Sequence, residues 1–184
     1  RQVSLHEIAE QAAGALRPTL DAKALEFQIA LPAELPDVWA DPERVGQVLR
    51  NLLNNAILHT PEGGSITLCA ALATEDEGRR TNDEGKALSP FVLRPPSFVT
   101  LRVRDSGPGI APEHVANIFD RFYRADRSRA RATGGAGLGL AIVKQLIEAH
   151  GGRVWAAGAP GQGACISFTL PAVPAELHPA LIDT

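Results

Sequence analysis

The sequence lacks several features that mark specialised classes of protein. It has no methionine in 184 residues, and because the chain opens at Arg1 we expect it to be a fragment of a longer protein. No apolar run approaches the ~20 residues that a membrane-spanning helix needs, and no signal peptide is visible. These absences argue against a membrane-spanning domain. We expect a cytoplasmic domain without direct membrane contact; anchoring of the parent protein in a membrane stays open.

Cysteine is scarce, with only two in the chain. Cys69 and Cys165 each lie in an apolar, strand-like run. We expect buried free thiols in a reducing compartment, with a disulfide as the less favoured alternative.

The chain also has little positive charge compared with proteins that bind nucleic acids. The net charge is −3, charged residues make up 21% of the chain and apolar residues 45%. Bulk electrostatics therefore give no support to a nucleic-acid role, and we expect no nucleic-acid partner. The composition and length suit one soluble globular domain with a real core, and we expect the fragment to be a monomer.

The clearest helical pattern runs from Asp41 to Thr60, with Asp41 as N-cap and Pro42 at the first helical position. One face carries the apolar residues Val45, Val48, Leu49, Leu52, Leu53, Ala56 and Ile57. A second stripe carries Arg44, Gln47, Asn51 and Asn55. Asparagine is a poor helix former, so amides on a helix face suggest a function, such as holding a hydrated magnesium ion. A polar face that carries two Asn by chance is the alternative.

The remaining elements follow from periodicity and turn residues. We expect a helix over 3–17, capped by Ser4 and followed by Pro18, a short helix over 112–118, and strands over 25–31, 38–40, 65–73, 98–104, 152–157 and 163–170. The charged stretch 74–97 is expected to be a loop, with a partner-binding insert as the alternative. Residues 1–171 form one domain in this interpretation, and 172–184 form a frayed C-terminal tail.

Asp105 follows the strand over 98–104, and two closely spaced glycines, Gly107 and Gly109, follow Asp105. The glycines let backbone approach a flat ligand. An ionised carboxylate only accepts hydrogen bonds, so it selects a donor such as an exocyclic amine. The alternative is a plain Asp-Ser-Gly turn.

Two further stretches suit phosphate groups. The segment 119–133 crowds together Arg121, Arg124, Arg127, Arg129 and Arg131, which suggests a mobile flap over phosphates or, less favoured, an RNA-binding arm. The glycines of 134–140 then open a helix that runs through Ala149, and a helix start presents backbone N–H groups to an anion. The spacing is not that of a phosphate-binding P-loop, so Lys144 is a weak candidate. No clear strand precedes these glycines, which disfavours a dinucleotide fold.

Taken together and in this order, these stretches resemble the catalytic and ATP-binding domain of bacterial sensor histidine kinases, within the superfamily of gyrase-type ATPases. Asn51 and Asn55 match the N box, and Asp105, Gly107 and Gly109 match the first glycine box. Residues 119–124 match the F box and 135–139 the second glycine box. The resemblance covers about residues 4–170.

The resemblance implies an α+β fold: a two-layer α/β sandwich whose mixed, mostly antiparallel sheet packs on three helices, with a mobile ATP lid at about 107–135. It implies that Asp105 reads the adenine amine, that Asn55 binds Mg²⁺ and that Arg121 and Arg124 contact the polyphosphate. The catalytic candidates are Asn51, Asn55, Arg121 and Arg124. The implied ATP-binding set is Asn51, Asn55, His59, Asp105, Gly107, Gly109, Ile110, Phe119, Arg124, Gly135, Gly137, Leu138, Gly139 and Leu140.

The resemblance also implies transfer of the γ-phosphoryl group of Mg-ATP to a histidine. That histidine belongs to an N-terminal dimerisation domain absent from this fragment, so the fragment alone is not expected to label itself. A response regulator would then accept the phosphoryl group on an aspartate.

Two departures keep alternatives open. Leu58 stands where family members often carry Lys, so the lid arginines or His59 then have to supply that charge. Asn51 stands where gyrase-like relatives carry a water-activating Glu, which favours transfer over hydrolysis. A catalytically weak nucleotide-sensing module and an anti-sigma-type serine kinase are the alternatives.

Overall fold

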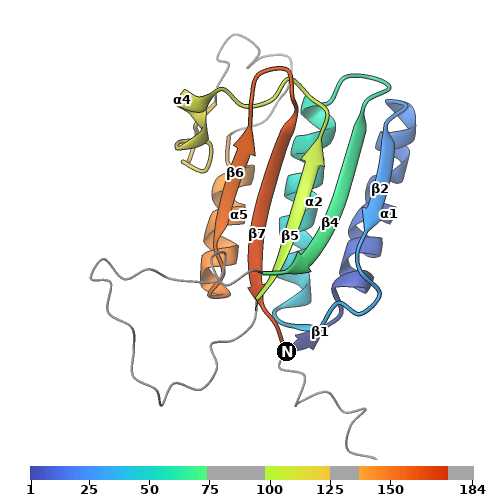
Figure 1. Ribbon diagram of the computed structural model, residues 1–184, viewed down its shortest axis with the longest axis vertical. Coiled ribbons are helices and arrows are strands. Elements are labelled where there is room, and N and C mark those ends of the chain that lie inside the picture. The colour runs from blue at the N-terminus through green and yellow to red at the C-terminus, as the bar shows by residue number, and fades with distance from the viewer. Residues whose placement is uncertain (74–97, 125–136, 174–184) are drawn as a thin grey trace, which may run out of the picture.

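The computed structural model describes residues 1–73, 98–124 and 137–173. Its elements in chain order are β1 (Gln2–Val3), α1 (Leu5–Ala22), β2 (Glu26–Ala30), β3 (Val38–Trp39), α2 (Pro42–His59), β4 (Ser65–Leu72), β5 (Phe98–Asp105), α4 (Pro112–Val115), α5 (Gly139–Ala149), β6 (Val154–Gly158) and β7 (Ala164–Pro171). A five-stranded sheet in the order β2-β4-β5-β7-β6 forms one layer. Helices α1, α2 and α5 lie together on one face of this sheet (Figure 1). The expected α+β sandwich on three helices is confirmed.

The sheet is mixed, as expected: β2 pairs parallel to β4, and the other three pairings are antiparallel. Along the central strand β5, Val99, Leu101 and Val103 are almost fully buried. Arg102 and Arg104 alternate with them and therefore point to the opposite face of the sheet. This alternation places the core between the sheet and the helical layer.

The two cysteines are free, as expected, but half-buried rather than buried. Cys69 on β4 pairs with Arg102, and Cys165 on β7 pairs with Arg104, so β5 lies between them. Two strand spacings amount to about 10 Å, whereas a disulfide needs Cα atoms about 4.4–6.8 Å apart. The sheet therefore prevents this disulfide. Burial raises the pKa of the Cys69 thiol, which favours its protonated form.

Helix α2 matches the expected bounds and lies at the centre of the helical layer. Val45, Leu49 and Leu52 are at most 1% exposed, so its apolar face is part of the core. Asp41 is the N-cap, and its carboxylate accepts from the backbone N–H groups of Glu43 and Arg44 at 2.9 and 3.2 Å. These hydrogen bonds, chiefly the one from Arg44, hold the pKa of Asp41 below its ordinary value.

Helix α1 was expected to end before Pro18, and this expectation is wrong. The helix continues through Pro18 to Ala22. Proline removes the hydrogen bond to the carbonyl of residue 14, four positions earlier. The last turn nevertheless places Leu20 in the core with only 2% of its side chain exposed, and this burial offsets the lost bond.

Both ends of the described chain depart from expectation. Val3 was assigned to the first helix but lies in β1, where it pairs with Val38 of β3; Ser4 caps α1 as expected. The tail was expected to begin at 172, yet Ala172 forms a bridge with Val38 and Val173 is 5% exposed. Ala172 and Val173 therefore belong to the packed fold and not to the tail. Helix α4 is also shorter than the expected 112–118.

Some expectations lie outside the described residues. These are the loop over 74–97, most of the arginine-rich segment and Gly135. Among the residues that the structure does describe, no helix combines the length and the apolar character needed to cross a bilayer.

Candidate functional site

The two asparagines of α2 have different surroundings. Both are half-buried. Asn51 Nδ2 donates to the carbonyl oxygen of Gly139, at the start of α5, over 3.5 Å. Asn55 lies one turn later and makes no side-chain hydrogen bond within the described part of the chain. Asn51 therefore ties α2 to α5, whereas the amide of Asn55 is available to a ligand.

The end of α2 is neutralised by a residue that the sequence did not single out. Lys23, the C-cap of α1, donates from Nζ to the carbonyl oxygens of Ile57 and Leu58 at 2.6 and 3.3 Å. A cation at the C-terminus of a helix is favourable because the last carbonyls are unpaired and carry partial negative charge. No local signal in the sequence could have revealed this contact, which joins residues 34 positions apart. The side chain of Leu58 itself is 43% exposed.

Asp105 is the last residue of β5 and only 7% exposed. Its Oδ1 accepts from the backbone N–H of Gly107 at 2.8 Å and from that of Ala164 at 3.3 Å. Its Oδ2 has no partner among the described residues, and no buried side-chain oxygen in that part of the structure lacks a partner, so Oδ2 retains contact with solvent. One oxygen thus fixes the carboxylate while the other can accept from a ligand.

The loop after Asp105 packs against the end of α2 through a glycine. A Cβ on Gly107 would lie 2.8 Å from Asp105 Oδ1 and 2.9 Å from the carbonyl oxygen of His59. Both distances are shorter than a Cβ tolerates, so only glycine fits here. The sequence-predicted residues Gly107 and His59 are therefore neighbours, and the acidic loop lies against the helix that carries the amides.

A hairpin between β6 and β7 supports this loop, and the sequence analysis missed its role. Gly163 has φ +76°, and a Cβ there would lie 2.0 Å from the carbonyl oxygen of Asp105. Gly109, at φ +80°, approaches the carbonyl oxygen of Ala159 equally closely, and Gly161 N donates to Pro108 O over 2.7 Å. The glycine-rich run over 158–163 is the sequence signal that could have indicated this role.

The F box and the second glycine box also meet. Phe122 N donates to the carbonyl oxygen of Gly137 over 3.0 Å, and Gly137 adopts φ +68°. A Cβ on Gly137 would lie 3.0 Å from the backbone of Phe122. Phe122 has φ +64°, which is uncommon for a bulky residue, and is 71% exposed. Nearby, His114 Nδ1 and the Tyr123 hydroxyl lie 2.8 Å apart.

The start of α5 presents backbone donors. Its N-cap is Leu138, which supplies no side-chain hydrogen bond. The first N–H groups of a helix have no partner within the helix, so those of α5 can bind an anion. This feature lies beside Asn51 because of the contact with Gly139.

Other predicted residues lie around this centre. Ile110, Phe119 and Leu140 are half-buried and pack against the core, and Arg124 is half-buried. Arg121 is exposed and lines a hollow of about 300 Å³ with Lys144 and Glu148, among others, against the outer face of α5. The structure therefore joins the N box to the second glycine box but places Arg121 on the solvent side of α5.

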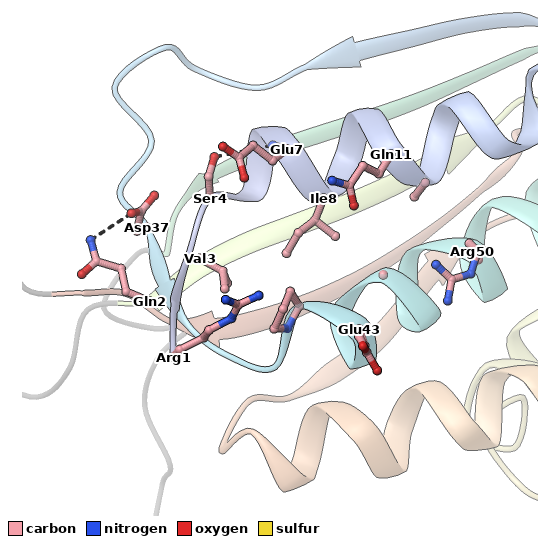
Figure 2. Close-up of a pocket in the computed structure, with 13 residues that line it drawn as sticks. Arg1, Gln2, Val3, Ser4, Glu7, Ile8, Gln11, Asp37, Glu43 and Arg50 are labelled. Carbon is pink, nitrogen blue, oxygen red and sulfur yellow. Dashed lines mark hydrogen bonds between the residues drawn. The ribbon is translucent and has the colours of Figure 1, made fainter.

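A larger cavity of about 640 Å³ lies elsewhere, between the starts of α1 and α2 (Figure 2). Glu7 of α1 and Glu43 and Arg50 of α2 line it, together with the first residues of the chain. Asn51 contacts α5, whereas this cavity faces α1. It is therefore a separate surface from the predicted site.

The described residues contain no group of three or more His, Cys, Asp or Glu side chains that could hold a metal ion by themselves. Mg²⁺ does not need such a group, because it keeps several waters and binds one or two protein oxygens plus substrate phosphates. The unengaged amide oxygen of Asn55 is a hard ligand of the kind that Mg²⁺ accepts. The residues present thus fit a magnesium ion brought with a polyphosphate.

Comparisons with known proteins agree with this geometry. A family model described as histidine kinase-, DNA gyrase B-, and HSP90-like ATPase matches residues 40–174. The sensor histidine kinase WalK of Bacillus subtilis (strain 168) is 38% identical over 147 residues, which cover 80% of this chain and 21% of WalK.

Solved structures match as well. Full-length ShkA in complex with AMPPNP has a TM-score of 0.71 and 33% identity, covering 94% of this chain and 31% of ShkA. The histidine kinase ThkA, in complex with the response regulator protein TrrA, has a TM-score of 0.68 and 25% identity, covering 97% of this chain and 43% of ThkA. The chain spans less than half the length of each of these three proteins. It belongs to the histidine kinase-, DNA gyrase B- and HSP90-like ATPase family, and its relatives are sensor histidine kinases.

Proposed function

We propose that this chain is the catalytic domain of a sensor histidine kinase. It binds Mg-ATP and transfers the γ-phosphoryl group to a histidine in a dimerisation domain of the same protein. The observation that carries the proposal is the meeting of three motifs at one end of the fold. Asn51 contacts Gly139 at the start of α5, and Gly107 of the acidic loop lies against His59 at the end of α2.

Asp105 recognises adenine in this proposal. Its Oδ1 is fixed by two backbone donors, so Oδ2 has a defined position from which to accept the exocyclic amine. A carboxylate has no hydrogen to donate, and it therefore discriminates against a base that presents an acceptor at the same position. Gly107 and Gly109 hold the loop in place, because their missing side chains make room for the carbonyl oxygens of His59 and Ala159.

The polyphosphate lies between α2 and the start of α5. Asn55 supplies an oxygen for Mg²⁺, and the unpaired N–H groups of α5 face phosphate oxygens. The bound metal neutralises charge on the transferring group. Phosphoryl transfer needs positioning and charge stabilisation more than covalent chemistry, so amides and backbone donors suffice. Arg124 and the arginines beyond the described residues add positive charge, whereas Arg121 reaches phosphate only if its segment moves from the outer face of α5.

Asn51 favours transfer over hydrolysis. A neutral amide cannot take a proton from water at neutral pH, so the site lacks a general base at this position. The acceptor is then a nucleophile from protein. The structure solved for ThkA with TrrA supports a response regulator as the next acceptor. Because ATP is a cytoplasmic substrate, we place the domain in the cytoplasm without membrane contact of its own.

The test uses the domain, the parent's own dimerisation hairpin and ATP labelled on the γ-phosphate. We expect label on the hairpin in an acid-labile, base-stable form, as a phosphohistidine gives, and no label on the domain alone. Acid-stable label would instead identify the serine kinase. ATP binding without any transfer would identify the nucleotide-sensing module, for which the exposed Leu58 is the supporting observation.

A further inference from the structure

We propose that His150 is a positioning residue that fastens the end of α5 to the start of α2, and so keeps the start of α5 aligned with the phosphates. The inference rests on the proposed function, because it assigns α5 to the nucleotide site. It concerns a residue at the opposite end of that helix, outside every motif that the sequence analysis singled out.

The imidazole bridges two helices through both of its nitrogens. Nδ1 lies 2.7 Å from the carbonyl oxygen of Leu146, one turn earlier in α5. Nε2 lies 3.1 Å from the backbone nitrogen of Asp41, 109 residues away. A carbonyl only accepts and a backbone N–H only donates, so Nδ1 carries the proton and Nε2 accepts. The two partners therefore select one neutral tautomer of His150.

The bridge satisfies a backbone donor that has no acceptor within its own helix. The Asp41 carboxylate already caps α2 through the N–H groups of Glu43 and Arg44. The backbone N–H of Asp41 lies outside the helix ladder, and His150 is its acceptor. His150 thus completes the start of α2 with a side chain that belongs to α5.

Helix α5 needs this second attachment because its own packing is narrow. Of its 11 residues only Val143 and Ile147 are fully buried. At its start, Asn51 of α2 donates to the carbonyl oxygen of Gly139 over a long 3.5 Å. The helix is about 16 Å long. Leu140 and Leu146 add partly buried contacts with the core. Apolar contacts are not directional, so the polar contacts at the two ends of this rod fix its tilt, and a tilt moves both ends. Figure 1 shows the end of α5 and the start of α2 at the same end of the helical layer.

The consequence concerns the phosphates and not the base. If the end of α5 is released, the N–H groups at its start lose their alignment with Asn51 and with the polyphosphate. Asp105 lies on β5 and is held by Gly107 and Ala164, which the tilt leaves in place. Affinity for ATP should therefore fall while affinity for adenosine, which has no phosphates, stays the same.

The experiment compares His150→Leu, which removes the acceptor, with His150→Gln, whose side-chain oxygen can accept from the Asp41 N–H. Calorimetry measures ATP affinity and an NMR titration measures adenosine affinity. We expect His150→Leu to weaken ATP binding about three- to tenfold, the range of one intramolecular hydrogen bond, and to change adenosine binding less than about twofold. His150→Gln should recover most of the loss. An equal loss for both ligands, no loss for ATP, or no recovery with Gln would overturn the proposal.

Two further readouts keep the outcomes separate. If the unaltered domain does not bind ATP, the proposed function fails; if it binds ATP and His150→Leu binds equally well, only the positioning role fails. If His150→Leu does not fold, ¹⁵N NMR of the unaltered domain still tests the bridge. A neutral ring with its proton on Nδ1, and a coupling from the Asp41 N–H to Nε2, are expected; a proton on Nε2 would overturn the inference.

Discussion

The two oxygens of Asp105 differ in their surroundings, and this difference makes its role testable. In Asp105→Asn, the amide oxygen can take the place of Oδ1 and keep the bonds from Gly107 and Ala164. The new NH₂ group then stands where Oδ2 accepted, facing the adenine amine donor to donor. We expect ATP affinity to fall about tenfold or more, as for a hydrogen bond to a charged group, and inorganic triphosphate affinity to stay within about twofold.

Calorimetry with both ligands checks this prediction. The melting temperature is the control, because the retained bonds to Oδ1 should leave the fold unchanged. An equal loss for ATP and for triphosphate would show that Asp105 does not read the base.

The neighbouring residues Asn54 and Asn55 allow a test of the metal role with a matched control. Asn54 is exposed, whereas Asn55 is half-buried on the stripe that includes Asn51. Asn55→Ala should abolish the increase in ATP affinity that Mg²⁺ gives, because it removes the amide oxygen that binds the ion. Asn54→Ala should leave that increase unchanged. Calorimetry with and without Mg²⁺ measures both variants, and an unchanged magnesium effect in Asn55→Ala would refute the metal role.

At the scale of elements, the hairpin between β6 and β7 holds the acidic loop through glycines that have almost the same positive φ. Gly161 and Gly163 have φ +78° and +76°. A Cβ on Gly161 meets nothing within 4 Å, whereas one on Gly163 would lie 2.0 Å from the Asp105 carbonyl oxygen. Gly161→Ala therefore measures only the cost of a left-handed residue, about 1–2 kcal/mol. Gly163→Ala adds displacement of Asp105.

We expect Gly163→Ala to lower the free energy of unfolding by at least about 3 kcal/mol, in the range of severe steric changes, and to weaken ATP binding as well. Gly161→Ala should lose only about 1–2 kcal/mol and bind ATP normally. Urea unfolding and calorimetry measure these effects. Similar losses in the two variants would mean that the close approach to Asp105 has no effect of its own.

The start of α2 gives a prediction about pH. Hydrogen bonds in the folded state lower the pKa of Asp41 from 3.8. A lowered folded pKa means that Asp41 stabilises the fold above its unfolded pKa, and that this contribution is lost as the pH falls below 3.8 through the folded value. Asp41→Asn keeps a capping oxygen but cannot titrate. Stability of the variant should therefore depend less on pH in this acid range, as thermal unfolding at a series of pH values would show.

Elements were predictable wherever local pattern decides them. The apolar spacing and the Asp-Pro start located α2 to within a residue, and alternation located β4, β5 and β7 nearly as well. The expectations that proved wrong concern residues whose contact partners are distant in the sequence. The strand β1 exists because Val3 pairs with Val38, and α1 passes Pro18 because Leu20 reaches the core. Neither contact produces a periodic pattern in the sequence, so pattern alone could not reveal it.

For the whole molecule and its site, too, local sequence predicted some features and distant contacts determined the others. The order of the four motifs predicted which segments meet, because glycines, amides and an acid at fixed places are what the proposed nucleotide would require. The supports of these segments were not predictable. Lys23 on Ile57 and His150 on Asp41 act on backbone atoms, and a backbone atom imposes no residue type on its own position. Gly163 is the exception, because its close approach to the Asp105 carbonyl oxygen requires glycine.

Whether the whole protein acts as a kinase or as an ATPase depends on whether the phosphoryl group goes to a protein side chain or to water. Asn51→Glu places a carboxylate where gyrase-like relatives carry their water-activating residue. We expect ATP hydrolysis without an acceptor to rise, by up to about 10²-fold for a positioned general base. Asn51→Gln is the control, since it keeps a neutral amide and should give no rise.

One contact in the structure opposes this gain. Asn51 now donates to the Gly139 carbonyl, and a carboxylate cannot, so Asn51→Glu also loosens the start of α5. ATP affinity, measured beside turnover, separates the two effects: Asn51→Glu should bind ATP more weakly and yet hydrolyse the bound nucleotide faster. Weaker binding without faster hydrolysis at saturating ATP would mean that Asn51 serves the packing of α5 on α2 and that the outcome of the reaction is decided elsewhere in the site.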